Sequence, residues 1–286
     1  MTSTWAQTNW LCDVYGEDRG DGTRKLPNGS VQSQLLSIID DLLLHKSSPK
    51  DSAAKTSSLI LSQQDIGTPW SNVLGLCLNA AENFEDKKDL KALGDYMVEL
   101  ASLPDAINEG AEPKTLDVGG ETSRIEPGQA VVFEEGKLWR DLPMFSWNVT
   151  ESFQGPEKYL ANLSSPASPD TAKAAWRNLN TYIALIAHNP GAQRIPVLAG
   201  MATLSLKTLA MALEYSRDTR LGKNTELHVP AAAQWFRIAG DKIERLCRDG
   251  TERMTAGDLW TGSGGGEVCD YARLQFWKAR IAKYGY

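Results

Sequence analysis

Apolar side chains recur every three or four residues along the first part of the chain, which is the spacing of one face of an α-helix. This spacing predicts helices over residues 31–42, 70–81 and 90–100. Ser30 directly precedes the first stripe and suits an N-cap, whereas Pro104 follows the third and cannot extend a helix. This part of the chain is therefore predicted to be mostly helical.

The same spacing returns in the second half of the chain. Ser168 suits an N-cap with Pro169 at the first helical position, and a helix is predicted from there to His188. The second half of this helix is apolar on nearly every side, which is typical of a helix surrounded by others. Further helices are predicted over residues 201–213, from Pro230 to Leu246, and over residues 267–283.

Residues 104–138 break this pattern because they are rich in Gly, Pro and Glu. They contain one strand-like stretch, Ala130–Phe133, which follows the turn residues Pro127 and Gly128. We therefore expect an insertion, either a long surface loop or a small β-hairpin. A loop of this length is usually functional or disordered.

Together these elements predict an all-α protein, a single multi-helix orthogonal bundle with the insertion at residues 104–138. We expect one helical domain over residues 1–286, with a flexible N-terminal segment at residues 1–29 and a C-terminal helical core at residues 168–284. Strands do not alternate with helices in the pattern, so Rossmann and P-loop architectures are disfavoured.

A glycine-rich stretch, Gly262–Gly266, raises the question of a phosphate-binding loop. Such a loop needs a preceding strand and a following helix N-terminus directed at the anion. The residues before the run show no strand pattern, the glycine motifs of nucleotide-binding proteins are missing, and Glu267 would repel a phosphate. We therefore expect a flexible connector between two helices.

Composition and charge limit which classes of partner and which cellular location we expect for the protein. The net charge is −6 and most basic residues have acidic neighbours, so a nucleic-acid partner, which requires a basic surface, is disfavoured. No apolar run reaches the ~20 residues of a membrane span, and the N-terminus lacks the pattern of a secretory signal. We expect a cytoplasmic protein without a membrane segment.

Polar residues beside tryptophans are the main candidates for a binding site. The chain has nine tryptophans, and Asn180 follows Trp176 by one helical turn on an otherwise apolar face. A buried amide must be hydrogen-bonded, so Asn180 either clasps neighbouring helices together or holds a ligand in a pocket.

Arg273 precedes Trp277 by one helical turn, which allows the guanidinium to stack on the indole. The stack either shields the ring at the surface or presents the guanidinium to an anionic ligand at the rim of a pocket. The candidate ligand-binding residues are Trp176, Asn180, Trp235, Arg273 and Trp277.

Motifs for catalysis or metal binding do not accompany these candidates. The histidines, His45, His188 and His228, lie far apart in the sequence, and none belongs to a metal-binding spacing. A nucleophile elbow of the form Gly-x-Ser-x-Gly does not occur. We expect neither a metal nor a cofactor, and the sequence assigns no catalytic residue.

Segments of the second half of the chain resemble a known family. They carry Trp176, Asn178 and Asn180; Pro230-Ala231-Ala232 with Trp235 and Gly240; and Phe276-Trp277-Lys278. In combination, over residues 30–284, they resemble an ascomycete fungal family of uncharacterised helical proteins, domain-of-unknown-function family 3632. The pattern departs from similar proteins at Val268-Cys269 and over Tyr271–Arg273. The resemblance implies a soluble helical protein of a mould, sometimes encoded in a cluster of secondary-metabolite genes.

We therefore expect an accessory protein of fungal secondary metabolism that binds a small aromatic or alkaloid-like metabolite or a partner enzyme. Two alternatives stay open: a cofactor-independent cyclase or isomerase that uses Asn180, Arg273 and a nearby acid, and a helical scaffold for protein interactions. A structure would separate these functions by showing an enclosed cavity against Trp176 and Trp277, an open groove, or neither. A scaffold predicts an exposed apolar patch instead of a closed pocket. The sequence predicts no oligomeric state.

Overall fold

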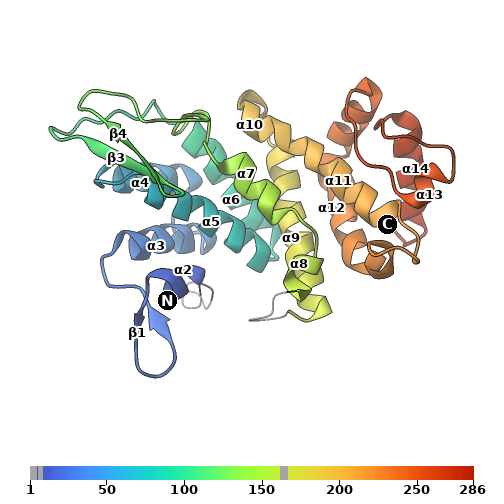
Figure 1. Ribbon diagram of the computed structural model, residues 1–286, viewed down its shortest axis with the longest axis horizontal. Coiled ribbons are helices and arrows are strands. Elements are labelled where there is room, and N and C mark those ends of the chain that lie inside the picture. The colour runs from blue at the N-terminus through green and yellow to red at the C-terminus, as the bar shows by residue number, and fades with distance from the viewer. Residues whose placement is uncertain (1–4, 6–8, 162–166) are drawn as a thin grey trace. The chain divides into compact units, whose positions relative to one another are not determined.

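The computed structural model describes residue 5, residues 9–161 and residues 167–286. The described part is mainly helical with small two-stranded sheets, which confirms the predicted all-α class (Figure 1). The chain packs into two compact units: Met1–Asn83 with Lys91–Val149 forms unit 1, and Phe84–Leu90 with Thr150–Tyr286 forms unit 2. The expectation of one domain stays a prediction, because two compact units can belong to one domain.

The helices in the first half of the chain begin at capping residues. The Ser30 hydroxyl accepts a hydrogen bond from Ser33 N at 3.2 Å, as its predicted role requires. The three predicted stripes lie in α3, α5 and α6. In order, the elements are α2 (Trp10–Tyr15), β1 (Glu17–Asp18), β2 (Arg24–Lys25), α3 (Val31–Leu43), α4 (Pro49–Leu61), α5 (Gly67–Asn83), α6 (Lys87–Ala101), β3 (Lys114–Val118), β4 (Glu121–Ile125), β5 (Val132–Phe133), β6 (Gly136–Lys137) and α7 (Phe145–Ser152).

The N-terminal segment, residues 1–29, has local structure where the structure describes it. α2 begins after Asn9, whose side chain accepts from Leu11 N, and Leu11 itself is fully buried. β1 and β2 pair as an antiparallel ladder. The predicted flexibility of this segment also covers residues 1–4 and 6–8, which lie outside the described residues.

The insertion at residues 104–138 contains two hairpins. The predicted strand-like stretch Ala130–Phe133 supplies β5, which pairs with β6. The sequence analysis missed the longer hairpin of β3 and β4 (Figure 1). Gly119 and Gly120 join these two strands at φ values of 61° and 89°, which suit the two-residue turn of a hairpin. The Gly-Gly pair between two short strand-forming stretches was the signal for this hairpin.

Unit 1 has an apolar core of its own. Trp70 is fully buried, its Nε1 donates to Pro143 O at 3.0 Å, and its ring meets Trp139 edge-on with centroids 5.7 Å apart. The buried hydroxyls of Thr56 and Tyr96 hydrogen-bond each other at 2.8 Å. These three polar groups of the core are therefore paired, whereas the buried Nδ2 of Asn72 has no partner among the described residues.

The helices of unit 2 pack around α9. Ser168 caps this helix as predicted, accepting from Thr171 N at 3.1 Å, and Pro169 is its first residue. The elements are α8 (Glu157–Leu160), α9 (Pro169–His188), η1 (Ala192–Arg194), α10 (Pro196–Ala199), η2 (Gly200–Thr203), α11 (Leu204–Leu213), η3 (Gly222–Asn224), α12 (Thr225–Asp249), α13 (Asp258–Thr261) and α14 (Tyr271–Ala282).

Two of these helices begin at positions that differ from the prediction. α12 starts at Thr225, so Pro230 lies inside the helix rather than at its first position. α14 starts at Tyr271 rather than Glu267, because residues 267–269 pair with residues 252–254 in extended form. Two hydrogen bonds fix this pairing, from Met254 N to Glu267 O at 2.9 Å and from Cys269 N to Glu252 O at 2.8 Å.

The glycine run Gly262–Gly266 follows α13 and packs around Trp260. The indole Nε1 donates to Gly266 O at 2.9 Å, and a Cβ on Gly265 would stand 1.9 Å from the ring. A helix, not a strand, precedes the run, so the arrangement of a phosphate-binding loop is missing. Close approach to Trp260 accounts for glycine at position 265.

One stretch of unit 2, Pro196–Leu213, is long and apolar enough to cross a membrane by length and composition. It comprises α10, η2 and α11, and 61% of it is buried inside the structure. Core helices of a folded unit satisfy the same criterion, so this stretch is weak evidence for a membrane span.

Candidate functional site

Asn180 joins three helices of unit 2 at a buried point. Its Oδ1 accepts hydrogen bonds from Thr208 Oγ1 on α11 and from Trp235 Nε1 on α12, both at 2.7 Å. Its Nδ2 donates to Trp176 O, one turn earlier on α9, at 2.8 Å. The amide oxygen is therefore used twice within the protein, and the geometry is that of a clasp between helices.

Arg273 on α14 and Glu214 at the end of α11 form a second buried polar centre. Both side chains are 0% exposed. The guanidinium binds the carboxylate through two bonds, from Nε to Oε1 at 2.7 Å and from Nη2 to Oε2 at 2.9 Å. Trp277 Nε1 also donates to Oε1, at 2.6 Å, and Gly257 N donates to Oε2, at 2.9 Å. We call these residues the Glu214–Arg273 centre.

The remaining donors of Arg273 hold the segment between α12 and α14. Nη1 donates to Met254 O at 3.0 Å and to Glu267 O at 2.9 Å, and Nη2 donates to Thr255 O at 3.1 Å. The guanidinium also lies 5.5 Å from the Trp277 ring, as the sequence spacing predicted. This stack lies in the core and not at the surface, because both side chains are fully buried, and the ligand-binding role of Arg273 stays a prediction.

Trp176 fills the core beside Phe153, with ring centroids 4.9 Å apart. It is fully buried, and within the described part of the chain its Nε1 has no hydrogen-bond partner. Such an orphan donor is uncommon in a protein core. Its ring still contributes apolar area, so Trp176 is above all a packing residue.

The structure thus brings the five candidate residues together in two groups, Asn180 with Trp176 and Trp235, and Arg273 with Trp277. All five are fully buried. Asn180 and Arg273 already bind protein partners, and none of the five lines the groove described next. Their assignment as ligand-binding residues stays a prediction.

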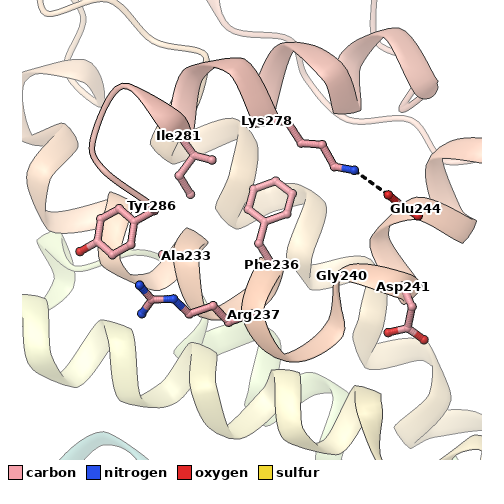
Figure 2. A pocket seen from close by; sticks show the side chains of 9 residues that line it. All are labelled: Ala233, Phe236, Arg237, Gly240, Asp241, Glu244, Lys278, Ile281 and Tyr286. Carbon is pink, nitrogen blue, oxygen red and sulfur yellow. Dashed lines mark hydrogen bonds and ion pairs between the residues drawn. The ribbon is translucent and has the colours of Figure 1, made fainter.

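An open groove of about 540 Å³ lies on the outer side of α12 and α14 (Figure 2). We call it the α12–α14 groove. Apolar groups form its middle, and charged groups surround them. Its lining residues are Ala233, Phe236, Arg237, Gly240, Asp241, Glu244, Lys278, Ile281 and Tyr286.

The charged groups of the groove differ in how they are paired. Lys278 Nζ lies 2.5 Å from Glu244 Oε1, and this hydrogen bond, followed by the lysine charge, lowers the pKa of Glu244. Arg237 stacks on the Tyr286 ring at 5.0 Å and has no carboxylate partner among the described residues. Among the described residues, the ion-pair contact of Asp241 is a long one, with His188 Nδ1 at 3.6 Å.

A kink in α12 shapes this groove. Ala239 has φ −128° and ψ 30°, outside helical geometry, and it separates Phe236 and Arg237 from Gly240 and Asp241. A Cβ on Gly240 would meet no atom within 4 Å, so open space faces the backbone there. The groove was not anticipated from the sequence. Gly240 inside a long helix was the available signal, because glycine is an unfavourable residue in the interior of a helix.

The described residues contain no group of three or more His, Cys, Asp or Glu side chains that could hold a metal ion. The most enclosed histidine, His228, is fully buried with Nε2 2.9 Å from Glu157 Oε1. Burial raises the pKa of Glu157, while the hydrogen bond and charge of His228 lower it, and the net shift is downward. This pair is separate from the groove.

Comparison with known proteins assigns the chain to a family. A family model described as "Protein of unknown function (DUF3632)" matches residues 75–281. No curated protein and no solved structure matches the chain. The matched residues include α12 and α14, and thus most of the groove. The chain therefore belongs to the domain-of-unknown-function family 3632.

Proposed function

We propose that unit 2 binds a small aromatic metabolite in the α12–α14 groove. The observation that carries this proposal is the groove itself: an open hollow with aromatic side chains, Phe236 and Tyr286, and charged groups at its edges. Its volume of about 540 Å³ is within the range of small-molecule sites. An accessory role in fungal secondary metabolism, expected from the family resemblance, is part of the proposal.

One of the helices that line the groove, α14, is also anchored to the core of unit 2. Arg273 and Trp277 of α14 are anchored to Glu214 in the core, while Lys278 and Ile281 of the same helix line the groove. A binding surface on a well-held helix loses little conformational entropy when a ligand binds. The catalytic alternative depended on Asn180 and Arg273, whose polar groups are engaged with protein partners, so these two residues give it no support.

Filling the groove tests the proposal. Gly240→Leu adds a side chain where a Cβ meets no neighbour, so the variant is expected to fold and to obstruct the groove. Gly200→Leu is the matched control, because Gly200 also has open space at Cβ and lies outside the groove. A panel of small aromatic fragments, followed by ligand-detected NMR, should contain compounds that bind the wild type and the control but not Gly240→Leu. Equal binding to all three proteins, or no binding to any, would refute the proposal.

A further inference from the structure

We infer that the ligand of the α12–α14 groove carries an anionic group and a cationic group at opposite ends of its aromatic body. This inference rests on the proposed function and specifies the chemical class of the ligand. It follows from the placement of two charged side chains on α12, Arg237 and Asp241, at the two ends of the groove (Figure 2).

Arg237 provides the end that suits an anion. Its guanidinium stacks on the face of Tyr286 at 5.0 Å, which holds its plane and leaves its N–H groups free at the edge. Within the described residues no carboxylate lies within ion-pair distance of this guanidinium. A planar guanidinium with free N–H groups matches a carboxylate in shape and charge.

Asp241 provides the end that suits a cation. Its carboxylate is 57% exposed, and its ion-pair contact is with His188 Nδ1 at 3.6 Å, a long distance to an equally exposed imidazole. The other acidic group nearby, Glu244, is held by Lys278 at 2.5 Å, so this pair is close to neutral as a unit. Asp241 is therefore the acidic group of the groove that has no lysine or arginine partner among the described residues.

The space between these two ends suits a single aromatic ring. Arg237 and Asp241 lie four residues apart on α12, on either side of the kink at Ala239. The side chain of Phe236 and the bare backbone of Gly240 lie between them (Figure 2). A ring placed there would contact apolar surface while its two substituents reach Arg237 and Asp241.

Five probes with one benzene ring each can test this arrangement by calorimetric titration. They are 4-(aminomethyl)benzoate, with opposite charges at the two ends; phenylglycine, its isomer with both charges at one end; 4-methylbenzoate; 4-methylbenzylamine; and the neutral 4-methylbenzamide. Because exposed ion pairs contribute about 0.2–1 kcal/mol each, 4-(aminomethyl)benzoate should bind about 1.4- to fivefold more tightly than either singly charged probe. It should also bind more tightly than phenylglycine, and added salt should reduce the difference.

Two variants assign the ends. Arg237→Gln should reduce binding of 4-(aminomethyl)benzoate and 4-methylbenzoate by the same factor and leave 4-methylbenzylamine unchanged. Asp241→Asn should reduce binding of 4-(aminomethyl)benzoate and 4-methylbenzylamine by the same factor and leave 4-methylbenzoate unchanged. Both side chains are exposed, so both variants are expected to fold like the wild type.

The outcomes separate this inference from the proposed function. Equal binding of all five probes, or phenylglycine binding as tightly as its isomer, overturns the charge arrangement while the groove remains an aromatic site. The charge arrangement is also overturned if none of the five probes binds, although fragments of the wider panel bind the wild type and not Gly240→Leu. If no aromatic compound at all distinguishes Gly240→Leu from the wild type, the proposed function fails, and this inference fails with it.

Discussion

α14 contributes residues both to the Glu214–Arg273 centre and to the α12–α14 groove, from neighbouring faces. Arg273 and Trp277 project into the core, where every strong donor of the guanidinium finds an acceptor. Lys278 and Ile281 project to the groove, where the lysine binds one exposed carboxylate. A residue with many satisfied contacts is suited to hold a fold, whereas a residue with spare capacity is suited to meet a ligand.

The same comparison applies to the candidate residues chosen from the sequence. Asn180 and Arg273 stood out because a polar group beside tryptophans on an apolar face is unusual. In the structure this pattern marks buried polar centres that join helices and hold the segment 250–270. The groove residues look like an ordinary exposed helix face in the sequence. Variants that affect stability in one region and binding in the other would sharpen this contrast.

Arg273→Met should have the largest effect on stability. It leaves the Glu214 carboxylate buried without its ionic partner, which typically costs about 3–5 kcal/mol of unfolding free energy. Urea unfolding followed by circular dichroism would measure this loss. The double variant Glu214→Gln/Arg273→Met should recover part of it, because no unpaired charge stays in the core.

Arg245→Met is the control for that experiment. Arg245 is an exposed residue of α12, so its replacement should change the unfolding free energy by less than about 0.5 kcal/mol. If Arg273→Met were as stable as this control, the Glu214–Arg273 centre would not hold the fold, and the contrast with the groove would be lost.

Asn180→Leu should have the next largest effect. The apolar replacement leaves Trp235 Nε1 and Thr208 Oγ1 buried without their acceptor, at a cost of about 2–3 kcal/mol. Adding Trp235→Phe removes one of these orphan donors, so the double variant should lose less than the two single losses combined. A double-mutant cycle from urea unfolding measures the coupling. Strict additivity of the two losses would contradict the clasp.

The Glu157–His228 pair is intermediate in burial between the Glu214–Arg273 centre and the exposed pair of the groove. His228 is fully buried and Glu157 is 23% exposed. The pKa of folded Glu157 is below its ordinary value of 4.5. This carboxylate therefore stabilises the fold above that pH, and the contribution is lost as the pH falls through the lowered pKa. As the pH falls from about 6 to about 3, the unfolding free energy of the wild type should decrease by up to about 1 kcal/mol more than that of Glu157→Gln. Parallel pH profiles of the two proteins would contradict this.

Lys278→Met should have the smallest effect on stability. The lysine and its partner Glu244 are 41% and 43% exposed, and exposed ion pairs often contribute nothing measurable. We expect a urea midpoint that matches that of Arg245→Met. A clear loss of stability would show that the groove supports the fold as the Glu214–Arg273 centre does, and the two regions would no longer differ in kind.

The sequence by itself determined the positions of several helices and two of their caps. Periodic apolar positions located α3, α5, α6 and α9, and Ser30 and Ser168 cap helices where they were expected to. These features depend on residues within a few positions of one another, so local patterns carry them. The Gly119-Gly120 hairpin was also present in the sequence as a local signal, although it was missed.

Only the tertiary structure decided which polar residues are buried and which are open. Glu214 and Arg273 are far apart in the sequence, and no spacing rule indicates that they meet in the core. The kink at Ala239 likewise turns an ordinary helix face into one wall of a groove, with α14 as the other wall. The physical reason is that burial and pairing depend on contacts between distant segments, whereas periodicity reports only the immediate neighbourhood of each residue.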